Sequence, residues 1–180
     1  MRLRPADRDD WARLFAWRND PVTREHVANT APVPLETHMQ WLETVLEGMR
    51  LERPEMQLYI GCDGSRGVTP FVGTVRLDIN YATREAEISV TVDPGLRGRG
   101  YGYLLVCEAV EEARAMNLDA VVARIKEKNP ASLRTFADAE FKFAFIADDG
   151  YIVLRRTLNH VAPPAATPAP VAAEPRKRKR

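Results

Sequence analysis

Cysteine, histidine and long hydrophobic runs are scarce in this chain of 180 residues. Its two cysteines, Cys62 and Cys107, are too few for a disulfide framework and lack the spacing of metal ligands, so we expect no metal site. No apolar run approaches the ~18–20 residues that cross a bilayer, and the N-terminal stretch MRLRPADRDD contains no apolar signal core. We therefore expect a cytoplasmic protein without membrane contact.

Net charge is also small, at +1, but it is unevenly distributed. Arg176 to Arg180 supply five positive charges, whereas the other 175 residues carry 21 basic and 25 acidic side chains. Residues 161–175 contain five prolines and many alanines, which is typical of a disordered linker. We predict one folded domain over residues 1–160 and a disordered tail over 161–180. The basic run either docks onto nucleic acid or another anionic surface, or stays solvated without a partner.

A strand, a glycine-rich loop and a helix follow one another between Glu87 and Cys107. β-Branched residues alternate with polar ones as far as Val92, which predicts a strand, and the sequence Asp-Pro-Gly then ends it. From Tyr101 onward, apolar residues recur at helical spacing. Because the intervening glycines lack a Cβ and the helix begins with unpaired N–H groups, this arrangement favours binding of a phosphate.

Two common nucleotide motifs do not fit the loop. A P-loop needs Gly-Lys-Ser/Thr, whereas the chain has Gly102-Tyr103-Leu104, and a dinucleotide fingerprint beginning at Gly98 would need a third glycine in place of Tyr103. The pattern that fits is R-x-x-G-x-G, spelled Arg97-Gly98-Arg99-Gly100-Tyr101-Gly102. Taken alone, it is either a pyrophosphate cradle, with fixed positive charge from its arginines, or a tight turn that uses glycines for geometry.

The remaining periodicities predict an α+β fold, with a mixed, mostly antiparallel sheet of about six or seven strands and about four flanking helices. Further strands are expected over residues 2–5, 56–60, 71–79, 120–125, 141–147 and 151–157. A helix is expected over 8–18, capped by Asp7 and stopped by Asn19-Asp20-Pro21, and another over 131–139. A helix over 34–46 is expected to face the core with Leu35, Met39, Leu42 and Leu46. Three successive strands joined by short turns imply an antiparallel meander. The strand after the glycine-loop helix is expected to run parallel to the one before it.

Polar and aromatic residues on the first two predicted helices are candidates for substrate binding. Trp17-Arg18-Asn19 ends the first helix and either presents donors to a ligand or simply caps the helix. His38 and Trp41 lie three residues apart on one face of the second. They either line a substrate cleft or are a packed aromatic ring beside a histidine whose hydrogen bonds are satisfied.

A second motif follows the strand predicted over 120–125. It reads Asn129-Pro130-Ala131-Ser132, with Phe136 and Glu140-Phe141 after it. Together with the glycine loop and the order of elements, it resembles the GCN5-related N-acetyltransferase (GNAT) superfamily over roughly residues 2–157. The resemblance implies that acetyl-CoA is the acyl donor, with its pyrophosphate on the loop. The implied cofactor contacts are Val90, Val92, Arg97, Gly98, Arg99, Gly100, Tyr101, Gly102, Asn129, Ser132 and Phe136.

The chain departs from this family at two positions. Phe136 stands where the family commonly has a tyrosine that protonates the leaving thiolate, and it has no exchangeable proton. Glu140 stands where glycine is common and implies a modified end of the preceding helix. Protonation of the thiolate would then fall to water or to a side chain such as Tyr101 or Tyr103.

The resemblance also bears on the acceptor. Trp17, Arg18, Asn19, His38 and Trp41 look like the amino-sugar branch of the family, which acts on nucleotide-linked amino sugars in nonulosonic-acid (pseudaminic acid) biosynthesis. The ribosomal-protein N-terminal acetyltransferases share part of that pattern. Because an ammonium has no lone pair, a base is needed near neutral pH.

Glu87 is the candidate base. It lies on the polar face of its strand, where some family members carry a catalytic glutamate; the alternative is a plain solvent-facing residue. We predict an N-acetyltransferase in which a primary amine, such as that of a nucleotide-linked amino sugar, attacks the thioester directly. Alternative acceptors are a protein N-terminus or a nucleic-acid-linked amine, and the alternative to an enzyme is a CoA-binding module tethered to nucleic acid by the tail. A dimer is compatible with the sequence.

Overall fold

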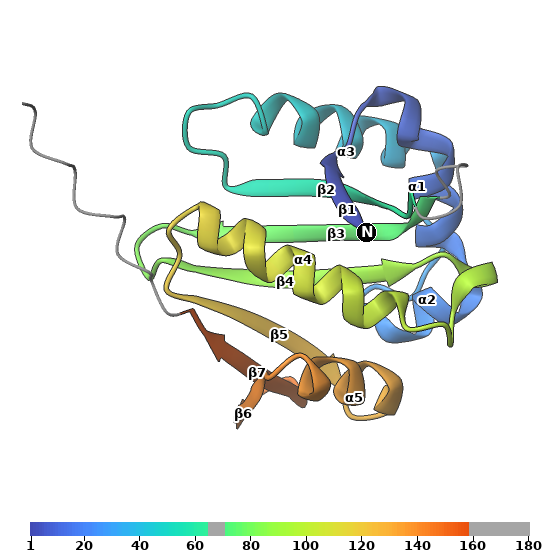
Figure 1. The fold of residues 1–180 in the computed structure, drawn as a ribbon. Helices are drawn as coiled ribbons and strands as arrows, with labels where there is room; N and C mark the ends of the chain where they lie inside the picture. Colours follow the sequence, from blue (N-terminus) through green and yellow to red (C-terminus); the bar gives the residue numbers. More distant parts are fainter. Residues whose placement is uncertain (65–70, 159–180) are drawn as a thin grey trace, which may run out of the picture.

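The computed structural model describes residues 1–64 and 71–158 and confirms the predicted α+β class (Figure 1). The strands are β1 (Arg2–Pro5), β2 (Met56–Cys62), β3 (Phe71–Asn80), β4 (Glu85–Val92), β5 (Ala120–Lys126), β6 (Lys142–Ile146) and β7 (Tyr151–Thr157). The α-helices are α1 (Trp11–Asn19), α2 (Pro21–His26), α3 (Leu35–Gly48), α4 (Tyr101–Ala115) and α5 (Pro130–Asp138), and the 3₁₀ turns are η1 (Arg8–Asp10) and η2 (Pro94–Leu96). The predicted linker and basic run lie outside the described residues.

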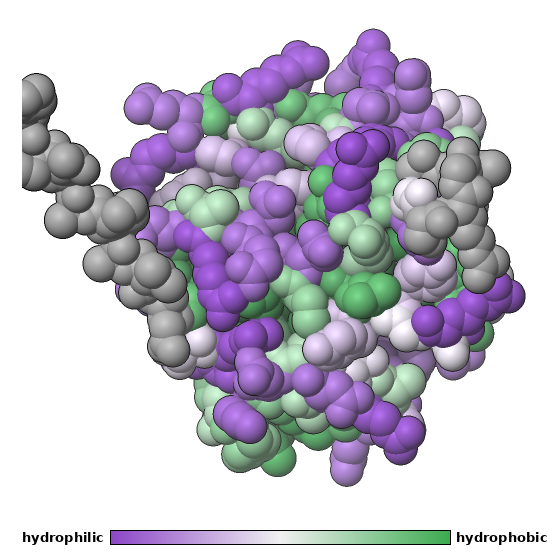
Figure 2. Space-filling view, viewed as in Figure 1, coloured by the Kyte–Doolittle hydropathy of each residue, from purple (hydrophilic) through white to green (hydrophobic). Residues whose placement is uncertain are grey.

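The strands form one mixed sheet in the order β1-β2-β3-β4-β5-β7-β6. β1 to β4 are antiparallel neighbours, and β4 and β5 are parallel, as predicted. β7 returns between β5 and β6, so the closing hairpin joins the sheet through its second strand. β6 is therefore an edge strand, and its Phe143, Phe145 and Ile146 are exposed. Hydrophobic side chains also reach the surface at the lower edge of the molecule (Figure 2).

Alternating side chains of the sheet enter two separate cores. α4 lies across β3 and β4 (Figure 1), and its Leu105 and Val110 are fully buried in the larger core with Leu77. On β2, Leu58 and Ile60 point to the opposite face, into a smaller core formed with α1 and α3. The period-two alternation of a strand thus places α4 on one face of the sheet and α1 with α3 on the other.

Two expectations about the N-terminal helices are wrong. The apolar stripe predicted for α3 included Leu35, which is 46% exposed, whereas the buried residues of this helix are His38, Leu42 and Val45. α2 was not expected, because Pro21 was interpreted only as a helix stop. Proline has no N–H to lose at the first helical position, and the side chain of Asp20 caps the new helix.

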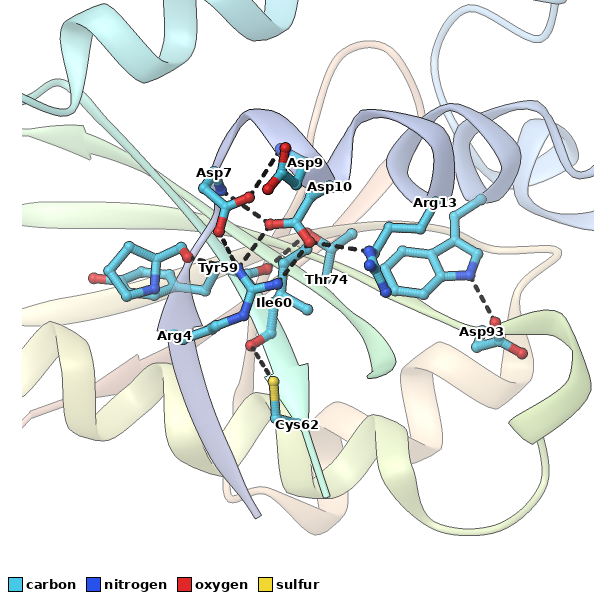
Figure 3. A network of polar contacts seen from close by, with 12 residues as sticks. Arg4, Asp7, Asp9, Asp10, Arg13, Tyr59, Ile60, Cys62, Thr74 and Asp93 are labelled. Atoms are coloured by element: carbon cyan, nitrogen blue, oxygen red, sulfur yellow. Dashed lines mark hydrogen bonds and ion pairs between the residues drawn. The ribbon is translucent and has the colours of Figure 1, made fainter. Parts of the chain in front are cut away.

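A buried carboxylate joins β1 to the start of α1 (Figure 3). Asp10 is completely buried and accepts hydrogen bonds from Arg4 Nη1 and Nη2 at 2.7 and 2.6 Å, while Arg13 Nε lies 2.9 Å from it. Asp7 caps η1, as predicted for the start of this helix, and donates its own N–H to Asp10. Although burial raises the pKa of Asp10, the hydrogen bond from Arg4 and that backbone N–H hold it below its ordinary value.

Within the described residues, no helix is long and apolar enough to cross a bilayer. Nor does this part of the chain contain a group of three or more histidine, cysteine, aspartate or glutamate side chains arranged to hold a metal ion.

Candidate active site

The sheet splits where β4 and β5 stop pairing, and we call this split the cleft. The two strands are in register over only three positions, from Glu85 with Ala120 to Glu87 with Val122. Beyond Glu87 they separate toward their carboxyl ends, with α4 and α5 on the same side (Figure 1). The backbone of β4 beyond Glu87 is therefore not paired on its β5 side.

The glycine loop has the conformation that an anion cradle needs. Gly98 and Gly100 have φ values of +72° and +82°, a region that residues with a Cβ rarely adopt. A Cβ at either position would meet no atom within 4 Å, so the backbone angle and not lack of space requires glycine. Gly100 is the N-cap of α4 and leaves its first-turn N–H groups without a side-chain cap. These features fit the pyrophosphate of an acyl-CoA.

Two hydrogen-bonded carboxylates, those of Asp20 and Asp93, position the glycine loop and the segment before it. Arg97 Nη2 donates to Asp20 Oδ2 at 2.5 Å and to Thr23 Oγ1 at 2.9 Å, at the start of α2. Trp17 Nε1 donates to Asp93 Oδ2 at 2.8 Å, and Figure 3 shows Asp93 at the end of β4. Arg97 is therefore already neutralised by a carboxylate. Arg99 is exposed and forms no ion pair with the described residues.

The second motif closes the other side of the cleft. Asn129 caps α5, with its Oδ1 accepting the N–H of Ser132 at 3.1 Å. Phe136 is buried and packs edge-to-face on Phe141, with 5.0 Å between the ring centroids. A Cβ at Gly102 would stand only 3.5 Å from the methyl group of Thr135. Thr135, which the sequence did not single out, thus marks where α4 and α5 approach each other.

The opposite face of β3 and β4 is polar and forms the floor of a groove. Asp78 is in register with Glu87, and Asn80 with Glu85. The groove has a volume of about 770 Å³ and is bounded by the end of α3, by the segment that follows it and by β5. The Glu87 carboxylate makes no hydrogen bond or ion pair with the described residues, and burial raises its pKa.

Residues 1–142 match the family model described as an acetyltransferase (GNAT) domain. The chain belongs to this family. The resemblance drawn from the two motifs is thereby confirmed, and the protein is an N-acetyltransferase that acts on amines with acetyl-CoA as acyl donor.

Similar proteins come from several bacteria. A Bacillus subtilis (strain 168) protein named "Putative phosphinothricin acetyltransferase YwnH" is 30% identical over 76% of this chain and 80% of its own. Two solved structures share the fold with a TM-score of 0.70. Ribosomal-protein-alanine N-acetyltransferase from Brucella melitensis is 24% identical and covers 88% of this chain and 100% of its own. Spermidine N-acetyltransferase from Vibrio cholerae, in complex with CoA and spermine, is 19% identical over 87% and 93%.

Three of the acceptor-side residues predicted for this GNAT enzyme are engaged within the fold. Trp17 is 4% exposed and donates to Asp93, as described above. The Asn19 side-chain amide donates to Val33 O at 3.0 Å and accepts the Val33 N–H at 2.8 Å. Arg18 Nη2 donates to Asn29 O at 2.9 Å. These bonds fasten the segment between α1 and α3, so an additional contact with an acceptor stays a prediction.

His38 and Trp41 pack against each other, as expected in one of the two alternatives. The His38 ring lies 5.4 Å from that of Phe15 and 5.5 Å from that of Trp41, between ring centroids. Burial lowers the pKa of His38, so the ring is neutral near pH 7. Its Nε2 is buried without a hydrogen-bond partner among the described residues. Contact of this pair with a substrate also stays a prediction.

Proposed function

We propose that this GNAT enzyme acetylates a primary amine held in the groove beside Glu87, and that Glu87 accepts the amine proton. The observation that supports this is the position of Glu87: it is the last β4 residue paired with β5, so it lies between the groove and the cleft. Its carboxylate has no hydrogen-bond or ion-pair partner in the described part of the chain, and burial raises its pKa, as suits a general base. The amine and the acyl donor would then approach Glu87 from different sides.

The other residues hold the donor in position. Acetyl-CoA, when bound, supplies an acetyl group activated as a thioester. The N–H groups of the glycine loop and of the first turn of α4 face its pyrophosphate. The unpaired β4 backbone between Val90 and Val92 provides donors for the thioester carbonyl oxygen, where negative charge develops during attack. Asn129 and Ser132 fix the start of α5 on the far side of the cleft.

A proton for the departing thiolate must come from somewhere other than residue 136. Phe136 carries none, and the Tyr101 hydroxyl donates to Asp63 Oδ2 at 2.7 Å. Tyr103 is 42% exposed and open to solvent. Water and Tyr103 are therefore the sources that we propose.

Glu87→Gln tests the assignment of the base. The amide keeps the shape of the side chain but cannot accept the proton, so we expect kcat to fall about 10²–10⁴-fold. Affinity for acetyl-CoA, measured by calorimetry, should not change. Glu85→Gln is the matched variant, because Glu85 lies on the same face but is already paired with Arg155 at 2.8 Å. It should change KM for the amine more than kcat, and an equal loss of kcat in both variants would remove Glu87 from this role.

Charge in the groove favours an acceptor without anionic groups. Four carboxylates line it, those of Glu55, Asp78, Glu85 and Glu87. Arg76 and Arg155 pair with Asp78 and Glu85, so Glu55 and Glu87 face the guanidinium of Arg53 among the described lining residues. A panel of amines tests this: a polyamine, an amino acid such as phosphinothricin, a peptide with a free N-terminus and a nucleotide-linked amino sugar. We expect the largest kcat/KM for the polyamine or another cationic amine. If kcat/KM is highest for the nucleotide-linked amino sugar, the N-terminal motifs indicate an amino-sugar substrate, and the preference inferred from the groove charge is contradicted.

A further inference from the structure

The groove carries negative charge that the domain does not neutralise. Asp78 is paired with Arg76 and Glu85 with Arg155, both at 2.8 Å. Glu55 and Glu87 form no ion pair with the described residues, and Arg53, whose guanidinium lies over the Tyr81 ring, is the cation that lines the groove with them. Since both unpaired carboxylates lie in one groove, a cationic occupant gains from two contacts there.

The described part of the chain ends beside this groove. Thr157, the last residue of β7, is in register with Ala120, which is in register with Glu85 of the groove wall. Two strand spacings of about 4.8 Å each thus separate the end of β7 from the groove, roughly 10 Å in all. Leu158 is buried, and its N–H donates to Asp119 O at 2.8 Å, so the exit point of the chain is fixed.

The chain beyond Leu158 ends in a basic run that is complementary in charge to the groove and far enough along the chain to reach it. Residues 159–175 are followed by Arg176-Lys177-Arg178-Lys179-Arg180. Eighteen residues lie between Leu158 and Lys177, and a chain of that length can extend to roughly 60 Å at most. This exceeds the distance to the groove, so the run is long enough to reach it, and attachment to the same chain raises its local concentration there.

We propose that this basic run occupies the groove of its own chain and that Lys177 and Lys179 are acetylated there. The inference rests on the proposed role of the groove beside Glu87. The lysine ammonium gives a proton to Glu87, and its nitrogen forms a bond to the acetyl carbonyl carbon. The carbon–sulfur bond breaks, the nitrogen releases its second proton to water as the amide forms, and CoA leaves as a thiolate that takes up a proton from water or Tyr103. The products are an Nε-acetyl-lysine and CoA.

Lysine, and not arginine, is the residue that can react. The arginine guanidinium stays protonated and has no nucleophilic nitrogen, so the three arginines of the run can only pair with carboxylates. Each acetylation removes one positive charge from the run and weakens its attraction to the groove. The reaction thereby limits itself.

Self-acetylation is measured on the full chain with acetyl-CoA. The chain contains five lysines, and the other three, Lys126, Lys128 and Lys142, serve as internal controls. Peptide mass mapping should find acetyl groups on Lys177 and Lys179 well before the controls. The first-order rate constant should not change on dilution of the protein, since the reaction is within one chain. Glu87→Gln should abolish the modification, and a rate proportional to protein concentration would overturn docking within the chain.

A second readout needs no acetyl-CoA. A carbodiimide joins a lysine directly to a carboxylate that it contacts, so we expect cross-links from Lys177 and Lys179 to Glu55 or Glu87. The double variant Lys177→Arg, Lys179→Arg keeps the charge and should lose both cross-links and acetylation. The absence of these cross-links, and of tail acetylation, in a sample that still acetylates a small amine would overturn this inference and leave the proposed function standing. Retention of nucleic acid by the run without cross-links to the groove would also overturn it.

Discussion

The ion pair between Arg97 and Asp20 gives the sharpest test of how the acyl-CoA loop is organised. Arg97 belongs to the glycine loop, but its guanidinium turns toward the start of α2 and not toward the cradle formed by the loop. We predict that this pair positions the loop and that Arg97 is not a phosphate ligand. Asp20→Asn is the suitable perturbation, because asparagine still caps α2 through Thr23 but carries no charge.

The size of the effect follows from the exposure of the pair. A hydrogen bond to a charged group contributes about 1.5–3 kcal/mol when well shielded. Here the Asp20 and Arg97 side chains are 15% and 32% exposed, so solvent screening reduces this to about 1–2 kcal/mol. If all of that energy orders the loop, the Kd for CoA rises about 5–30-fold. Because asparagine keeps the cap of α2, the free energy of unfolding should fall by less than this amount of about 1–2 kcal/mol.

Calorimetric titration of CoA into the protein measures this effect. The four proteins of a double-mutant cycle, combining Asp20→Asn with Arg97→Gln, should give a coupling energy of about 1–2 kcal/mol. Asp119→Asn is the control: it breaks a pair with Arg84, at the edge where β4 begins, in which both side chains are 45% exposed. Tighter CoA binding by Asp20→Asn would show that freed Arg97 contacts phosphate, and unchanged binding with zero coupling would also refute the positioning role.

Two further predictions concern stability and the thiolate proton. Asp10→Asn should lower the free energy of unfolding by about 2–4 kcal/mol in urea titrations, because Arg4 loses its buried partner. The pKa of Asp10 is lower in the folded state than in the unfolded state, so its carboxylate stabilises the fold fully above the unfolded-state pKa. This stabilisation is lost as pH falls through the folded-state pKa, and the difference between wild type and variant should shrink below about pH 4. A constant difference down to about pH 2 would contradict this. Phe136→Tyr should raise kcat several-fold if protonation of the thiolate limits turnover. The control Phe143→Tyr, at an exposed position, should leave kcat unchanged. Equal kcat values in the two variants would show that another step is limiting.

The sheet and the glycine loop could be predicted because their signals are local. Alternation along β4 sets which side chains face α4, and the positive φ angles fall on Gly98 and Gly100 within the motif. α2 could not be predicted in the same way, because Pro21 is compatible with both a helix end and a helix start. Its formation depends on Asp20, whose partner Arg97 is 77 residues away.

The residues predicted for the acceptor side follow the same rule: their positions on helices could be predicted from nearby sequence, but their contacts could not. Trp17 and His38 were correctly placed on helices, but their burial depends on packing against Asp93 and Phe15, which no spacing within a helix reveals. The contacts of these residues within the fold could therefore not be predicted from their spacing, and their contact with an acceptor stays a prediction. The groove that remains available is walled by the end of α3 and by β3 and β4, segments far apart along the chain.

β4 connects the groove at its amino end with the glycine loop at its carboxyl end. The strand meets the glycine loop at Val92, at its carboxyl end, and lines the groove between Glu85 and Glu87, at its amino end. Pairing with β5 stops at Glu87, so the carboxylate stands at the boundary between the two openings. A donor held by the loop and an amine held in the groove can then meet without competing for space. This geometry favours direct transfer from the thioester to the amine, as proposed for the groove beside Glu87.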